Sequence, residues 1–142
     1  MPLIKAVVDT NVVVSAFLSH HGASNVVLAA AAKGAFAMFA SPPLFFEYEE
    51  VMKRPEHLLK SGMSIAQVDR ALRDLAALIV PVDVRFLWRP QLRDPDDEMV
   101  LEAAINGGAD HIVTFNAKDF TVAERFGVAV LTPHKFLETI KR

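Results

Sequence analysis

Short apolar runs recur along the chain and are separated by longer amphipathic stretches. Runs of this length and continuity are typical of strands that are buried on both faces of a sheet. We therefore expect strands at Leu3–Val8, Phe36–Ala40, Val80–Val84, His111–Thr114 and Val128–Leu131.

The stretches between these runs carry signals for helices. Pro42 and Pro43 can open a helix because neither needs an amide donor in the first turn. Ser64 and Gln67 have the spacing of a capping box, and Asp94 is placed as an N-cap. We expect helices at Val12–Ser19, Ser24–Lys33, Pro42–Lys53, Ser64–Leu78, Asp94–Gly107 and from Pro133 to the C-terminus. Alternating strands and helices predict a three-layer α/β/α sandwich around a mainly parallel sheet of four to five strands, in one domain over residues 1–142.

Four acidic residues fall where this fold would bring them to one edge of the sheet. Asp9 closes the first strand, and Asp119 follows the fourth closely. The carboxyl ends of parallel strands line the ligand crevice in such sheets. Asp97 lies on the apolar stripe of its predicted helix, and Glu47 lies at the edge of another stripe.

Clustered carboxylates repel one another and tend to retain their protons unless a cation lies between them. Oxygen ligands of this kind suit Mg²⁺ or Mn²⁺. We therefore predict a divalent metal site, with Asp9 and Asp97 as direct ligands and with Glu47 binding through water or holding a second ion. Asn11, Thr114 and Asn116 add neutral polar groups to the same edge, where they could orient the carboxylates.

Each acid also has a purely structural explanation. Asp9 could cap the following helix, Asp97 could complete a capping box with Asp94, Glu47 could be solvated, and Asp119 could cap the next turn. The coincidence of four acids at one predicted edge favours the site. The remaining acids of the two helices are expected to face solvent: Glu50, Asp96, Glu98 and Glu102.

Composition narrows the class of protein. With 142 residues, 52% of them hydrophobic, a substantial core is expected. The absence of cysteine excludes disulfides, zinc–thiolate sites and a thiol nucleophile. No signal peptide is expected, and the longest apolar tract, Asn25–Ala32, is too short to cross a bilayer, so we expect a cytoplasmic protein.

The net charge of −2 argues against a strong electrostatic binder of duplex nucleic acid. The stretch from Arg85 to Arg93 holds three arginines and the single Trp88. It is either a strand that contacts phosphates and stacks a base or a solvated connection with the tryptophan folded onto the core. The five histidines show no ligand spacing and are expected at the surface or in the core.

Four stretches, in order, resemble the acidic motifs of the PIN-domain family. They are Val8–Ser15 (VDTNVVVS), Phe46–Pro55 (FEYEEVMKRP), Asp94–Ala104 (DPDDEMVLEAA) and Ile112–Phe120 (IVTFNAKDF). The ending Leu131–Leu137 (LTPHKFL) is similar to the branch of toxin components of type II toxin–antitoxin systems.

The resemblance implies a Mg²⁺- or Mn²⁺-dependent ribonuclease for single-stranded RNA, dimeric, with a cognate antitoxin protein as its partner. The quartet would be Asp9, Glu47, Asp97 and Asp119, supported by Asn11, Ser15, Thr114 and Asn116. Many members carry an acid at the position of Asn116, so the number of metal ions stays open.

Two other functions are compatible with the same residues. Phosphotransferases that form an aspartyl-phosphate also place an aspartate after the first strand, although Asn11 stands where their second aspartate is usual. A module that binds RNA or a partner without catalysis would retain the fold alone.

Overall fold

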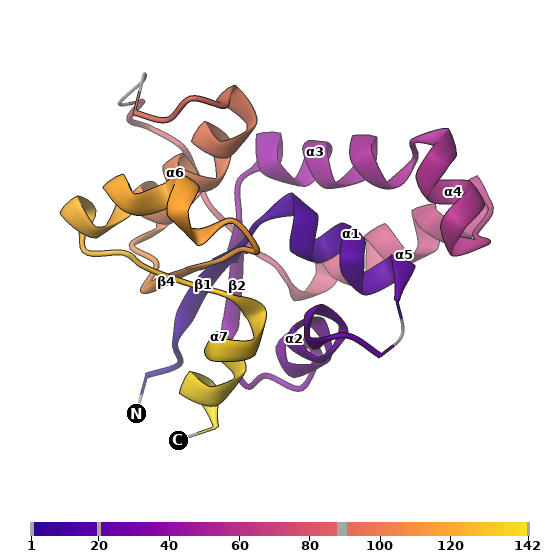
Figure 1. Ribbon diagram of the computed structural model, residues 1–142, viewed down its shortest axis with the longest axis horizontal. Helices are drawn as coiled ribbons and strands as arrows, with labels where there is room; N and C mark the ends of the chain where they lie inside the picture. The colour runs from indigo at the N-terminus through magenta and orange to yellow at the C-terminus, as the bar shows by residue number, and fades with distance from the viewer. Residues whose placement is uncertain (1, 20, 88–90, 142) are drawn as a thin grey trace.

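A parallel β-sheet forms the centre of the computed structural model, which describes residues 2–19, 21–87 and 91–141 (Figure 1). Within these residues the sheet has five strands in the order β3-β2-β1-β4-β5, and every neighbouring pair is parallel. The strands are β1 (Lys5–Val8), β2 (Ala37–Ala40), β3 (Val80–Pro81), β4 (His111–Val113) and β5 (Ala129–Leu131).

Helices connect the strands and cover the sheet, as the alternating pattern predicts. The helix α6 packs against β1, β2 and β4, whereas α1 packs against α2 and α3, and α2 packs against α7. The helices are α1 (Thr10–Leu18), α2 (Ala23–Ala32), α3 (Pro42–Met52), α4 (Pro55–Ser61), α5 (Ile65–Leu78), α6 (Pro95–Gly107), the 3₁₀ helix η1 (Ala117–Phe126) and α7 (Pro133–Ile140). The predicted α/β/α architecture is confirmed, and both ends of the chain lie at the same end of the molecule (Figure 1).

Three of the four residues of the central strand β1 are fully buried. Ala6, Val7 and Val8 have no exposed surface, which explains why the run reads as continuously apolar. At the end of α6 a glycine allows close packing, because a Cβ on Gly107 would lie 2.9 Å from side-chain atoms of both Phe39 and Val82. The helix α6 can therefore sit directly on β2.

The predicted helix starts are confirmed by their hydrogen bonds. Ser64 and Gln67 form a complete capping box at the start of α5. The Asp94 side chain accepts a hydrogen bond from the Asp96 amide at 2.9 Å, and the Thr132 side chain accepts one from the Lys135 amide. These local signals fix where α5, α6 and α7 begin.

Three segments differ from the sequence prediction. Pro55, which follows the predicted helix Pro42–Lys53 and is not predicted to belong to an element, occupies the first turn of α4, where a missing amide hydrogen costs nothing. The segment after β4 forms the 3₁₀ helix η1 rather than a simple turn. Residues 85–87 and 91–93 form no strand, because the amides of Arg85 and Phe86 donate hydrogen bonds to Asn106 Oδ1 rather than to a neighbouring strand. Trp88 lies outside the described residues.

The expectation that Glu98 and Glu102 face solvent is wrong. Glu98 is 3% exposed and Glu102 is 5% exposed. The segment before α6 folds over this face, and Glu98 Oε1 accepts hydrogen bonds from the amides of Gln91 and Leu92 at 2.7 and 2.9 Å. Asp96 and Glu50 are exposed, as predicted.

No single helix in the described ranges has the length and apolar character to cross a membrane, although the bent pair α1 and α2 together would pass on those two criteria.

Candidate functional site

The site forms at the carboxyl ends of β1 and β4, which are neighbours in the middle of the sheet. From β1 the chain builds the sheet outward through β2 and β3, and it later returns to the other side of β1 as β4. This reversal is the topological switch point at which parallel sheets open a crevice. Asp9 leaves β1 here, and Thr114 leaves β4 beside it.

Asp9 is held in place from the neighbouring strand. The buried hydroxyl of Thr114 donates a hydrogen bond of 2.7 Å to Asp9 Oδ2, and Asp9 itself is 6% exposed. Asp9 occupies the N-cap position of α1, but its side chain makes no capping hydrogen bond, so capping does not explain it. Burial raises the pKa of Asp9, the charges of Asp94 and Asp119 add to this, and the bond from Thr114 opposes it.

Glu47 enters the site from α3. It is 8% exposed, and its Oε2 accepts a hydrogen bond from the Thr10 hydroxyl, so it is not the solvated helix acid of the structural explanation. Burial is the main reason that the pKa of Glu47 rises to about 7, and the charges of Asp96 and Asp9 raise it further against the bond from Thr10. The next residue, Tyr48, donates its buried hydroxyl to the carbonyl oxygen of Val8 and so ties α3 to the end of β1.

Asp97 projects from the first turn of α6. Burial raises its pKa to about 7, followed by repulsion from Asp9 and then from Asp94, Asp119 and Asp96. The Asp94 side chain caps the Asp96 amide, and no capping box with Asp97 forms. Among the described residues Asp97 thus has no capping or ion-pair partner, and its pKa responds to the charge of Asp9.

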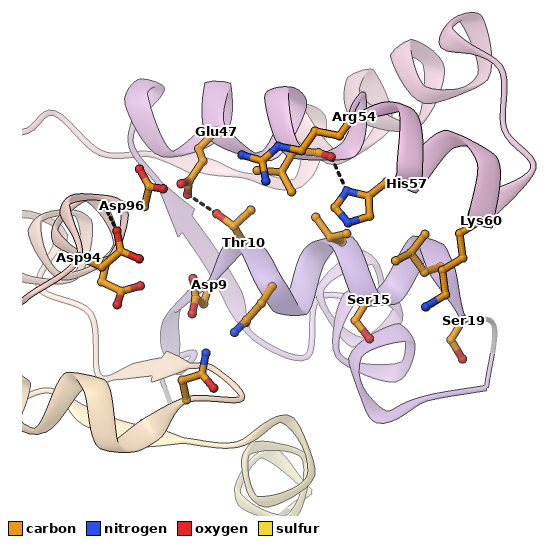
Figure 2. Close-up of a pocket in the computed structure, with 16 residues that line it drawn as sticks. Asp9, Thr10, Ser15, Ser19, Glu47, Arg54, His57, Lys60, Asp94 and Asp96 are labelled. Atoms are coloured by element: carbon orange, nitrogen blue, oxygen red, sulfur yellow. Dashed lines mark hydrogen bonds between the residues drawn. The ribbon is translucent and has the colours of Figure 1, made fainter.

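A cavity of about 530 Å³ joins these side chains (Figure 2). It contains the predicted site residues Asp9, Asn11, Ser15, Glu47, Asp97 and Asn116. Thr114 lies behind Asp9 with no exposed surface. Asp119 is exposed and does not line the cavity, although its charge raises the pKa of Asp9 and Asp97.

Several lining residues were missed from the sequence. Asp94 and Asp96 extend the acidic end, and Thr10 supports Glu47. The opposite end contains Arg54, His57 and Lys60, from the α3–α4 junction and α4. Their position depends on α4, and the signal that could have revealed it is a proline in the first turn of a new helix.

The donor chemistry of the acidic end fits a divalent cation. Asp9, Glu47 and Asp97 have no lysine or arginine ion-pair partner among the described residues, and each has a raised pKa. The buried Oδ1 of Asn11 has no hydrogen-bond partner in the same set. Hard oxygen donors of this type match Mg²⁺ or Mn²⁺.

The acids are not drawn into a closed ligand shell. Within the part of the chain that the structure describes, no three acidic or histidine side chains lie close enough to hold one ion together. The fit is therefore to an ion that keeps much of its water, as Mg²⁺ usually does.

Comparison with protein families gives a match to the PIN domain over residues 5–118, from β1 to the start of η1. The chain belongs to the PIN-domain family. The match spans the segments that place Asp9, Glu47, Asp97 and Asn116, and it ends one residue before Asp119. PIN domains are generally nucleases that act on nucleic acid and typically use divalent metals, which supports a hydrolase. No curated protein matches the chain.

Proposed function

We propose that this PIN domain is a Mg²⁺- or Mn²⁺-dependent endoribonuclease that cleaves phosphodiester bonds in single-stranded RNA. The observation that carries the proposal is the gathering of Asp9, Glu47 and Asp97 at one cavity from three separate segments, with raised pKa values and no cationic partner in the described residues. Clustered carboxylates without a cationic partner destabilise the folded protein, so such an arrangement indicates that they bind a ligand.

In this proposal Asp9 and Asp97 hold the ion directly, and Glu47 and Asp119 act through water or complete a second site. When bound, the ion lowers the pKa of water and neutralises charge on the phosphate. The hydrogen bond of 2.7 Å from Thr114 orients Asp9 and favours its ionised form, and the bond from Thr10 does the same for Glu47. Asn11, Ser15 and Asn116 offer polar groups to the substrate along the cavity.

The biological setting is part of the proposal and rests on the resemblance of the C-terminal segment to toxin components. The protein would be the toxin of a toxin–antitoxin pair, act in the cytoplasm as a homodimer, and be inhibited by a cognate antitoxin. Such partners commonly place a basic side chain in the acidic crevice, and the acidic end of this cavity is suited to receive one.

The proposal is tested by incubating the purified protein with a mixed RNA pool in Mg²⁺, Mn²⁺ or chelator and mapping the cut ends. Cleavage is expected with either metal, and it should disappear with chelator and in Asp9→Asn and Asp97→Asn. Asp74→Asn on the exposed face of α5 makes the same chemical change away from the cavity and should cleave normally. Equal cleavage by the wild type and Asp97→Asn would refute the assignment.

Two observations favour a second candidate, a PIN module that binds RNA or a partner without cutting. The described residues hold no preformed group of three metal-binding acids or histidines, and Asn116 stands where many relatives carry an acid. This candidate predicts RNA binding that is unchanged by chelator and by Asp97→Asn, with no cut ends under any metal condition.

A further inference from the structure

The cavity that holds the acids has a second, basic end. Arg54, His57 and Lys60 line it, and Figure 2 shows them on the wall formed by α3 and α4, beyond Glu47 and across from Ser15 and Ser19. One continuous cavity therefore contains carboxylates at one end and potential cations at the other.

The start of α4 fixes the basic wall. Arg54 is the N-cap residue before Pro55, and α4 packs against α1. The His57 Nδ1 lies 2.7 Å from the carbonyl oxygen of Val51, which assigns the ring proton to Nδ1 as donor. In the described residues no partner occupies its other ring nitrogen. His57 thus links α4 to α3 while keeping one nitrogen available.

These cationic groups are little used by the protein itself. Among the residues that the structure describes, Lys60 forms no ion pair and Arg54 approaches only Glu50, at 3.9 Å, with side chains that are 47% and 74% exposed. Exposed pairs of this kind contribute little. Lys53, by contrast, lies 2.6 Å from both Glu49 and Asp69, outside the cavity lining. The charge of Lys53 is thus compensated by two carboxylates of the protein, whereas the charges of Arg54 and Lys60 remain available to bind a ligand.

The facing wall supplies hydroxyl groups from α1. The Ser15 hydroxyl accepts a hydrogen bond of 3.0 Å from Ser24, so its own proton remains free to be donated. Ser19, at the end of α1, lines the same region. Guanidinium, ammonium and hydroxyl donors around one cavity are the groups that bind phosphate oxygens.

We propose that Arg54, His57 and Lys60, with Ser15 and Ser19, form a subsite for a backbone phosphate of the same RNA strand whose cleaved phosphate lies at the acidic end. This inference rests on the proposed function. Along α1 the distance from Thr10 to Ser19 is about 13 Å at ~1.5 Å per residue. A strand with about one charge per ~3.4 Å would need several nucleotides to reach both ends. The subsite therefore selects polynucleotides over mononucleotides and sets the path of the strand along the cavity.

The subsite is tested by measuring the affinity for a fluorescent single-stranded RNA at a series of NaCl concentrations. All proteins carry Asp97→Asn and the buffer contains chelator, so that no RNA is cut. Each phosphate contact contributes about 0.7 to the slope of log affinity against log salt for single strands. Adding Arg54→Ala and Lys60→Ala should weaken binding and, because the subsite holds one phosphate, flatten the slope by about 0.7. The control pair Lys33→Ala and Lys135→Ala, both exposed and outside the cavity, makes the same charge change and should leave the slope nearly unaltered.

A second readout uses the cleaving protein without the background substitution. The Arg54 and Lys60 double variant should show a higher KM for a long oligonucleotide with little change in kcat, and no change for a dinucleotide. Arg54→Gln keeps the three-carbon stem of the side chain and replaces Arg54→Ala if that truncation destabilises the fold. It should likewise raise the KM for the long oligonucleotide. If polyglutamate of equal charge competes as well as RNA, the site is a general anion site and the inference is overturned.

The two proposals fail in different ways. Wild-type protein that never cuts RNA, but whose salt slope flattens as predicted in the double variant, refutes the nuclease and retains the subsite. Protein that cuts RNA in Mg²⁺, with a double variant that binds and cuts like the control pair, retains the nuclease and refutes the subsite.

Discussion

Replacing Asp97 by asparagine should make the metal-free protein more stable at pH 8. The folded protein raises the pKa of Asp97 from 3.8 to about 7, mainly by burial and by the charge of Asp9. The folded state therefore holds a proton that the unfolded state releases between about pH 4 and pH 7. Stability falls as the pH rises through this window, and above it the full penalty for the ionised carboxylate remains.

The size of this penalty follows from the two pKa values. At about 1.4 kcal/mol for each pH unit between 3.8 and about 7, the upper limit is about 4 kcal/mol. Asp97 is only partly buried, so solvent screening reduces the expected gain of Asp97→Asn to about 1–2 kcal/mol. For a chain of this size that corresponds to a rise in Tm of roughly 3–6 °C at pH 8. At pH 4 most of the gain should be lost, because the folded carboxyl is protonated and the unfolded one, with a pKa of 3.8, is only about half ionised.

Thermal denaturation followed by circular dichroism, in chelator at pH 4 and pH 8, measures this effect. Asp74→Asn removes a charge from the exposed face of α5 and should change Tm little at either pH. Saturating Mg²⁺ at 100 times its Kd should stabilise the wild type by about 2.7 kcal/mol and the variant by much less. If Asp97→Asn is no more stable than the wild type at pH 8, the electrostatic reasoning is wrong.

Three further predictions concern the pH dependence of metal binding, the hydrogen bond to Asp9 and the packing at Gly107. The rise in Tm caused by Mn²⁺ should be larger at pH 8 than at pH 5.5. Protons compete with the metal for Glu47 and Asp97, whose pKa values are about 7. A rise that does not depend on pH would contradict this prediction. Thr114→Val removes the 2.7 Å hydrogen bond to Asp9, which should lower the free energy of unfolding by about 1–3 kcal/mol at neutral pH. The loss of this bond should also move the acidic limb of the pH profile of cleavage to higher pH. An unshifted profile would argue against ionised Asp9 in the reaction. Gly107→Ala places a methyl 2.9 Å from two core side chains and should cost about 1–3 kcal/mol in urea denaturation, while metal binding by the folded variant stays normal; wild-type stability would show that the core yields there at no cost.

The parts of the fold that depend on local chemistry could be read from the sequence. The buried strand β1 is a continuous apolar run, and the capping box of Ser64 and Gln67 marks the start of α5. The inward positions of Glu47 and Asp97 followed from their places relative to the apolar stripes of their helices. These features are set by residues that are neighbours in the chain or on one helix face.

The parts that depend on distant segments could not be read in this way. Glu98 looks solvent-exposed on an isolated helix, but the segment that holds Gln91 and Leu92 covers it. Pro55 can end one helix or open another, and only the packing of α4 against α1 shows that it opens one. The basic end of the cavity was missed for this reason, because Lys60 reaches the site only through α4.

The central claim is that Asp9 and Asp97 share a divalent cation. A crystal of the full chain grown with Mn²⁺ and measured at a wavelength with strong manganese anomalous scattering tests it directly. We expect an anomalous peak within ~2.2 Å of carboxylate oxygens of both residues, lost when the crystal is grown from Asp97→Asn protein. A strong peak bound elsewhere, or none at this cavity at saturating Mn²⁺, would show that Asp9 and Asp97 do not share an ion.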